Sequence, residues 1–462
     1  MMPRHVAASR IRSLFSAAMS AMYRSEVPKY GRLLELTTEV NLRTLEADPA
    51  LRQALRQAGE LDRLDVERHG AVRLGTPEEL ATMRRLVAVM GMRPVGYYDL
   101  SSAGVPVHST AFRPVDEDEL RQNPFRLFTS LLRPELIADE ALRRGALELL
   151  GSRQIFTPGA LALIERYEAE GGLTEEEAET FVREAIETFR WHGRVRVSRA
   201  QYEALLSAHR LIADITCFPG PHINHLTPRT LDIDAVQRAM PEWEITPKEV
   251  IEGPPRRNCP VLLRQTSFKA LTETIAFAGE DAGASGSHAA RFGEIEQRGV
   301  ALTPAGRALY DQLLASHLAA GPGASLEAAF ATLPDDHDSL RRAGLAWYRY
   351  VPTENGAVQA KALGSTDAEA LLAAGCLRCE PLTYEDFLPV SAAGIFQSNL
   401  GEGERGAGFA TGNRGAFEAA LGAEVMDEMR LYEAAQQESL DASAKALGVA
   451  ALTRAKPSNL AA

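Results

Sequence analysis

Two stretches with β-type alternation enclose a long helical block in this chain. Apolar and polar side chains alternate over residues 93–130 and again after residue 217, whereas residues 134–215 repeat apolar side chains at helical spacing. We therefore expect an α+β fold with three parts. Residues 1–133 form N-terminal helices and the first β-rich part of the core, 134–215 a helical insertion or subdomain, and 216–462 the second β-rich part with C-terminal helices.

Length and charge exclude several classes of protein. A chain of 462 residues predicts two or three domains, or one core with large insertions. The net charge of −12 argues against nucleic acid or an anionic membrane as the main partner. No apolar run approaches the roughly 18–20 residues of a membrane span. Four cysteines in this length do not make a disulfide framework, so we expect reduced thiols and a cytoplasmic protein.

The N-terminus is interpreted as part of the fold. Residues 1–24 are amphipathic and lack acids, which superficially resembles a transit peptide. However, Ile11, Phe15, Met19 and Met22 form one apolar stripe, which is typical of a helix packed on a core. Residues 8–58 are predicted to be helical, with Pro28 separating two segments.

A strand and a helix follow at residues 67–90. His69, Ala71 and Arg73 alternate with apolar residues and glycine, which predicts a half-buried strand. Thr76 is expected to cap the next helix, with Glu79 closing a capping box. Further helices are expected at 135–150, 158–170, 174–191, 198–215, 232–240, 303–318 and 425–447, strands near 248–251, 260–266 and 345–351, and a loop at 279–288.

Residues 291–299 are the most informative stretch for chemistry. Read as a strand, they place Phe292, Glu294, Glu296 and Arg298 on one face. A carboxylate turned into a protein needs a cation, because an isolated buried charge is too costly. Our hypothesis is that Glu294 binds a divalent metal together with two distant histidines. The alternative is an exposed strand face with a Glu296–Arg298 ion pair.

The residues alone leave the two histidines open. His69, His108, His222 and His225 all lie in β-type or proline-bounded segments, and three ligands from distant segments leave no local spacing signature. Two histidines and one carboxylate leave metal positions open, and this suits non-haem Fe(II) that binds both a chelating substrate and O2.

Arg73 is the candidate for holding an anionic substrate. Its planar, permanently charged fork matches a carboxylate, and on the strand it projects to the same side as His69. The alternative is a structural salt bridge, for instance to Glu67 or Glu79.

Five motifs resemble those of the 2-oxoadipate dioxygenase/decarboxylase family, over about residues 10–440. They lie at residues 66–73, 96–100, 108–114, 222–234 and 389–396. Separately, residues 292–298 are similar to the strand that supplies the carboxylate ligand in hydroxyphenylpyruvate dioxygenases, which have a vicinal-oxygen-chelate fold. The resemblance implies a vicinal-oxygen-chelate-like central sheet that encloses a metal site, with large helical insertions.

The resemblance also implies site residues. It places the metal on His69, His225 and Glu294, the substrate on Arg73, and a further substrate contact on the backbone of Val390. The choice of His225 over His222, and of Glu294 over Glu296, follows from the resemblance alone.

The implied activity is an Fe(II)-dependent conversion of 2-oxoadipate and O2 to (R)-2-hydroxyglutarate and CO2, in lysine catabolism. The expected partners are a small 2-oxo dicarboxylic acid and O2, with neither nucleic acid nor membrane, and the oligomeric state is left open. Two other classes fit the same residues. One is a divalent-metal lyase or isomerase that acts on a 2-oxo acid without O2, and the other is a metal-stabilised protein that binds an oxo acid without turnover.

Overall fold

The first N-terminal helix packs against one face of the central sheet. The computed structural model describes residues 5–101, 104–280, 285–321, 323–388 and 413–453. The expected helical segment is confirmed as three helices: α1 (Ala8–Glu26), α2 (Pro28–Ala47) and α3 (Pro49–Gln57). The predicted apolar stripe of α1 is buried, with Ile11, Phe15 and Met19 fully inaccessible. These residues join the same apolar cluster as Val72 of the sheet.

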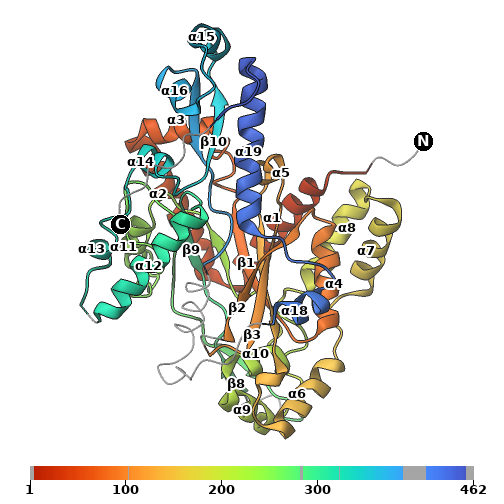
Figure 1. The fold of residues 1–462 in the computed structure, drawn as a ribbon. Helices are drawn as coiled ribbons and strands as arrows, with labels where there is room; N and C mark the ends of the chain where they lie inside the picture. Colours follow the sequence, from red (N-terminus) through yellow and green to blue (C-terminus); the bar gives the residue numbers. More distant parts are fainter. Residues whose placement is uncertain (1–4, 102–103, 281–284, 322, 389–412, 454–462) are drawn as a thin grey trace.

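The central sheet has five strands. Its first part follows the order β1 (Arg68–Leu74), α4 (Pro77–Ala88), β2 (Arg93–Asp99), β3 (Val107–Arg113), α5 (Glu117–Gln122) and β4 (Arg126–Leu132). The strands lie in the order β2-β3-β4-β1-β5 (Figure 1), with β5 (Leu226–Pro228) at one edge. β1 runs parallel to β4, and the other neighbours are antiparallel. The expected α+β class, a central β-sheet with large helical insertions, is confirmed.

β1 differs from the expected half-buried strand, because it is covered on both faces. It lies between β4 and β5 in the interior of the sheet. Ala71 on one face joins one large apolar cluster, and Val72 and Leu74 on the other face join a second. The polar residues His69 and Arg73 are buried as well. Alternation therefore identified the strand, but it did not identify the second packing partner.

The helical block supplies five helices and a short 3-10 turn. They are η2 (Pro134–Leu136), α6 (Glu140–Gly151), α7 (Pro158–Glu170), α8 (Glu175–Glu187), α9 (Arg199–Ala208) and α10 (Arg210–Cys217). In Figure 1, α6, α9 and α10 lie at one end of the sheet, and α7 and α8 lie beside it. The helix expected at 198–215 is wrong as one element. His209 is extended there, and its Nδ1 accepts a hydrogen bond from the backbone N–H of Leu211 and so caps α10.

The second β-rich part contains the strand that carries Glu294 and Glu296. It contains α11 (Ile233–Ala239), η3 (Met240–Trp243), β6 (Leu263–Ser267), β7 (Glu273–Ala276), β8 (Ser285–His288) and β9 (Glu294–Arg298). β6 pairs with β9 and β7 pairs with β8, both antiparallel. Two expectations are wrong here. Residues 248–251 form no strand beyond isolated bridges nearby, and part of the loop expected at 279–288 is β8.

The C-terminal part contains a two-stranded sheet and several helices. Its elements are α12 (Pro304–Ala320), α13 (Leu326–Ala329), α14 (His337–Arg342), β10 (Tyr348–Pro352), α15 (Gly356–Leu363), α16 (Ala368–Ala373), β11 (Leu377–Pro381), α18 (Arg414–Leu421) and α19 (Glu428–Leu447). The long helix α19 runs along β10 (Figure 1), with Ser439 and Ser443 hydrogen-bonded to the backbone of Tyr350.

The start of α4 confirms one half of the predicted capping box. The Thr76 hydroxyl accepts the backbone N–H of Glu79 at 3.2 Å. The second bond of a capping box, from the backbone N–H of Thr76 to the Glu79 carboxylate, is absent from this described segment. The carboxylate accepts from the backbone N–H of Gly75 and from Arg153 instead. A long-range ion pair to the helical block therefore replaces the local contact.

Two other expectations concern the whole chain. In the part of the chain that the structure describes, no helix is both long and apolar enough for a bilayer crossing. Cys217, Cys259 and Cys376 are free thiols, as expected. The division at residues 133 and 215 stays a prediction.

Candidate metal centre

Three elements bring the candidate ligands together. His69 lies on β1, His225 directly precedes β5, and Glu294 is the first residue of β9. β5 pairs with β1, so that Thr227 lies opposite His69, and a bridge between Arg229 and Glu296 joins β9 to the end of β5. The three ligands thus meet through strand pairing between distant parts of the chain.

The backbone around His225 lies unusually close to β1. The N–H of Asn224 donates to the carbonyl of Ala71 at 2.9 Å, and the carbonyl of Asn224 accepts from the N–H of Phe292 at 3.1 Å. Gly70 permits this approach, because a Cβ there would lie 2.6 Å from Ile223 Cδ1 and 3.2 Å from the carbonyl oxygen of His225. A larger residue at this position would crowd Ile223 and the His225 carbonyl, so Gly70 helps His225 to lie near the sheet.

The side chains of the triad face one another. Nε2 of His69 lies 3.0 Å from Oε1 of Glu294, and Nε2 of His225 lies 3.8 Å from the same oxygen. One ligand atom from each residue lies within 4.8 Å of the others, and all three residues are buried. Among the residues that the structure describes, no other group of three or more His, Cys, Asp or Glu side chains lies close enough together to hold a metal ion.

Neighbouring groups fix the triad from outside. Oε1 of Glu294 accepts from Oγ1 of Thr227 at 3.0 Å and from Nε2 of Gln265 at 2.9 Å. The ring of Phe292 lies 4.9 Å from that of His225, and the ring of Phe387 lies 5.0 Å from that of His69. Such outer contacts hold ligands in a binding geometry. Sequence analysis missed Thr227 and Gln265, although Thr227 lies within one of the motifs.

Burial and charge prepare the ligands for a cation. Burial lowers the pKa of His225 to about 4, against the carboxylate of Glu294, so its imidazole is neutral near pH 7. Burial alone would raise the pKa of Glu294, but His225 and His69 outweigh it and the pKa is lowered. For His69, burial acts to lower the pKa, while Glu296 and Glu294 raise it above the usual value. The site therefore offers a neutral imidazole, a carboxylate and a second imidazole held between two carboxylates.

Glu296 faces the same side as Glu294, as the alternation predicted. Its Oε2 lies 2.9 Å from Nδ1 of His69, on the opposite side of the ring from Glu294. Arg298 donates to both oxygens of Glu296, at 2.9 and 2.8 Å. The ion pair expected in the alternative interpretation exists, but the exposed strand face does not, because Glu296 and Arg298 are buried.

A buried charge network continues behind Glu296. Arg126, which is fully inaccessible, lies 2.9 Å from Glu67 and 3.9 Å from Glu296, and it also pairs with Glu385. Arg63 in turn binds Glu67 and Glu385. Each carboxylate of this network thus has at least one guanidinium partner, as burial of charges requires.

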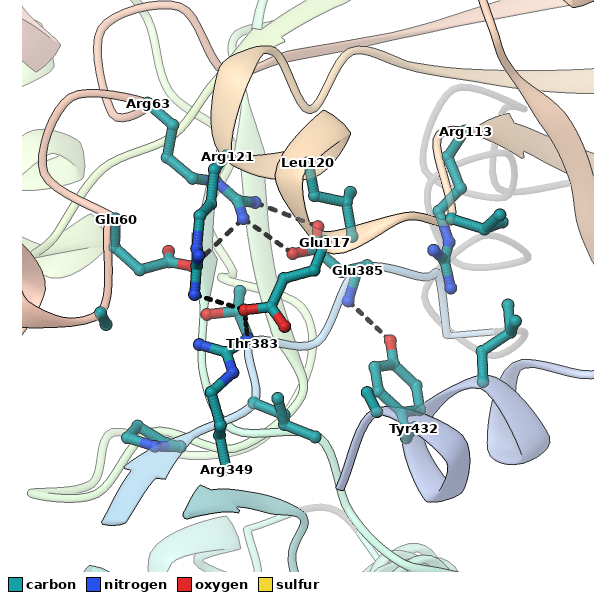
Figure 2. Close-up of a pocket in the computed structure, with 16 residues that line it drawn as sticks. Glu60, Arg63, Arg113, Glu117, Leu120, Arg121, Arg349, Thr383, Glu385 and Tyr432 are labelled. Carbon is teal, nitrogen blue, oxygen red and sulfur yellow. Dashed lines mark hydrogen bonds and ion pairs between the residues drawn. The ribbon is translucent and has the colours of Figure 1, made fainter. Parts of the chain in front are cut away.

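Arg63 and Glu385 of this network also line a small cavity. Figure 2 shows this cavity, of about 70 Å³, with Arg63, Glu385 and Tyr432 among its lining residues. His69, His225 and Glu294 are not among the described residues that line it. The cavity therefore borders the back of the charge network, and the candidate ligands face elsewhere.

Arg73 projects to the side of the triad but pairs with neither expected partner. Its Nη1 donates to Oδ2 of Asp214, on α10, at 2.7 Å. Glu67 and Glu79 are engaged by other arginines, among them Arg63 and Arg153. Asp214 was missed in the sequence, although it is the single charged side chain in the apolar run 211–215, which is the signal that could have found it.

The other two histidine candidates lie outside the triad. Nε2 of His222 lies 3.3 Å from Oδ1 of Asp214, and His108 is hydrogen-bonded to Tyr97 at 3.3 Å. The geometry therefore brings together His69, His225 and Glu294. Val390, the remaining site residue expected from the sequence, lies outside the described residues, and its role stays a prediction.

The buried histidines predict an acid-sensitive stability. Burial lowers the pKa of His108 to about 4, and the same holds for His209 and His225. Between pH 6.5 and 4 the unfolded chain binds protons that the folded chain does not, so the free energy of unfolding falls as the pH falls through this window. His108→Gln should reduce this slope by up to about 1.4 kcal/mol per pH unit, measured by urea unfolding of the metal-free protein. Equal slopes for variant and parent would show that the pKa of His108 is not lowered in the folded protein.

Known proteins match this chain over nearly its whole length. A family model described as 2-oxoadipate dioxygenase/decarboxylase matches residues 15–399. The 2-oxoadipate dioxygenase/decarboxylase of Escherichia coli (strain K12) is 56% identical over 446 residues, which cover 95% of this chain and 98% of the relative. The protein of that name from Pseudomonas putida is 57% identical over 459 residues, covering 97% and 99%.

The solved structures agree with these matches. The crystal structure of the hydroxyglutarate synthase from Pseudomonas putida in complex with 2-oxoadipate superposes with a TM-score of 0.90 at 54% sequence identity. The match covers 96% of this chain and 99% of that one.

Proposed function

The chain belongs to the 2-oxoadipate dioxygenase/decarboxylase family, and from this premise we propose that it is an Fe(II)-dependent enzyme. It converts 2-oxoadipate and O2 to (R)-2-hydroxyglutarate and CO2, as a step of lysine catabolism. The buried group of His69, His225 and Glu294 is the observation that supports this proposal. The overall reaction balances, because 2-hydroxyglutarate and CO2 together contain all the atoms of 2-oxoadipate and O2.

The donor set fits the proposed metal. Two imidazole nitrogens and one carboxylate oxygen from three separate segments leave several coordination positions open, which is the arrangement that non-haem Fe(II) oxygenases use. His69, His225 and Glu294 would hold Fe(II), which would supply coordination positions for the chelating 2-oxo acid and for O2. The neutral imidazole of His225 offers a lone pair without first losing a proton.

The chain's own residues would orient and shield the reactants. Thr227 and Gln265 hold one oxygen of Glu294, so the carboxylate keeps one orientation when a cation binds. Phe292 and Phe387 cover the two imidazole rings and keep bulk water from them. Arg73 would bind a substrate carboxylate through its planar fork.

The test is O2 uptake by the Fe(II)-loaded protein with 2-oxoadipate, with CO2 and 2-hydroxyglutarate measured in the same reaction. We expect O2 consumption, CO2 and 2-hydroxyglutarate in equal amounts. Product without O2 uptake would instead establish a lyase. Failure to turn over 2-oxoadipate and other short and long oxo acids, with metal bound, would leave a binding protein.

A further inference from the structure

Asp214 lies at the centre of a buried polar cluster next to the candidate substrate arginine. Its Oδ2 accepts from Arg73 at 2.7 Å, and its Oδ1 accepts from Nε2 of His288, on β8, at 2.8 Å. Nε2 of His222 approaches the same Oδ1 at 3.3 Å. Three side chains therefore hold the carboxylate. Arg73 binds one of its oxygens, and the two histidines approach the other.

A second layer keeps His288 in place. Its Nδ1 is hydrogen-bonded to the hydroxyl of Tyr202, on α9, at 2.8 Å. Phe218 and Trp191 pack against the His288 ring, with centroids 4.9 and 6.1 Å away. Tyr202, Asp214 and His288 are all at most 5% exposed. The direction of the Asp214 carboxylate is thus fixed by packing as well as by hydrogen bonds.

The cluster links the helical block to β1. Asp214 and Tyr202 come from residues 134–215, and Ile212 and Ile215 on the same helix as Asp214 join the apolar cluster that contains Ala71. An arginine has several rotamers, and a buried guanidinium needs an anionic partner. Asp214 supplies that partner from α10, and so it favours one rotamer of Arg73.

The spacing along β1 indicates which end of a substrate Arg73 would meet. His69 and Arg73 are four residues apart on one face, so their Cα atoms are separated by about 13 Å. His69 and Arg73 project from the same face of β1, so the guanidinium lies on the side of the triad. A 2-oxo acid that chelates the metal through its first carboxylate would extend its far end toward Arg73.

We propose that Asp214 is a positioning residue that orients Arg73 toward the substrate carboxylate far from the metal, and that it thereby determines the preference for dicarboxylic 2-oxo acids. The helical block then has a role in specificity, since it carries this carboxylate to the site. This inference rests on the proposed function, because it assumes a 2-oxo acid bound at the triad.

The test compares Asp214→Asn with the parent on two substrates of equal chain length. 2-Oxoadipate has the far carboxylate, and 2-oxohexanoate lacks it. For 2-oxoadipate we expect kcat/KM to fall at least about tenfold, mainly through KM, because the guanidinium loses the carboxylate contact that orients it. For 2-oxohexanoate we expect little change, so the selectivity ratio of the two substrates falls by the same factor.

A matched control separates orientation from stability. Glu79 forms a similar buried pair with Arg153, at 2.6 and 2.8 Å, and this pair also ties the helical block to the rest of the chain. Glu79→Gln should lower Tm without changing the selectivity ratio. His288→Gln should change the ratio in the same direction as Asp214→Asn but less, and it serves as the test if Asp214→Asn does not fold.

The outcomes distinguish this inference from the proposed function. If the parent does not turn over 2-oxoadipate, the proposed function fails, and the inference with it. If the parent is active but the selectivity ratio of Asp214→Asn is unchanged, the inference alone is overturned. An equal loss for both substrates would also overturn it, because Arg73 would then act on the carboxylate near the metal.

Discussion

Glu294→Ala is expected to abolish tight binding of a divalent metal and, with it, turnover. Glu294 supplies the carboxylate of the triad, and both imidazole Nε2 atoms lie within 3.8 Å of its Oε1. Loss of an outer contact to a ligand already costs about 10–100-fold in metal affinity, so loss of the ligand itself should exceed that range. The measurement is calorimetric titration of the metal-free protein with Co(II), beside O2 uptake with Fe(II).

Glu296→Gln is the matched control for this variant. Glu296 lies two residues along the same strand face, but it contacts the far nitrogen of His69. Its replacement should weaken metal binding less than Glu294→Ala does, because the triad stays complete. If Glu296→Gln removed the metal and Glu294→Ala did not, the ligand would be Glu296, and the assignment along β9 would be wrong by two residues.

Arg126→Met should destabilise the protein by about 3–5 kcal/mol, because it leaves buried carboxylates without their shared cation. Arg126 is fully buried, and it lies within ion-pair distance of Glu67, Glu296 and Glu385. Methionine fills much of the same volume, so the loss should come from charge rather than from a cavity. The measurement is urea unfolding at neutral pH.

The control for Arg126→Met is an arginine pair at the surface. Arg85 donates to both oxygens of Glu168, and both side chains are partly exposed. Arg85→Met should cost no more than about 1 kcal/mol, because water replaces the lost partner. Equal destabilisation by the two variants would show that burial of the network contributes little. Recovery of the Arg126→Met protein at acidic pH, where the carboxylates are protonated, would support the electrostatic cause.

The two networks give the candidate site different kinds of support. On the side of the candidate metal ligands, Glu296 contacts His69, and Arg126 and Arg298 in turn pair with Glu296. Around Arg73, Asp214 and the helical block hold the proposed substrate side. Rigid support of this kind keeps reacting groups in a fixed geometry, which is a large part of how enzymes lower barriers.

The elements that could be predicted are those with a strong local pattern. The stripe of α1, the bounds of α7 and the shared face of Glu294 and Glu296 follow from side-chain periodicity, which needs no knowledge of the rest of the chain. Where a local side chain competes with periodicity, the prediction fails. His209 caps α10 and divides a stretch that reads as one helix.

By itself, the sequence determined the α+β class, the strand face that carries the carboxylates, and the residue types of a candidate metal site. The resemblance to a known family then selected His225 over His222. Only the tertiary structure decided that Arg73 pairs with Asp214 rather than Glu67 or Glu79, and that the Glu296–Arg298 pair is buried. The physical reason is that both results depend on which distant segments pair with β1 and β9, and burial and partner choice are properties of those contacts, not of local spacing.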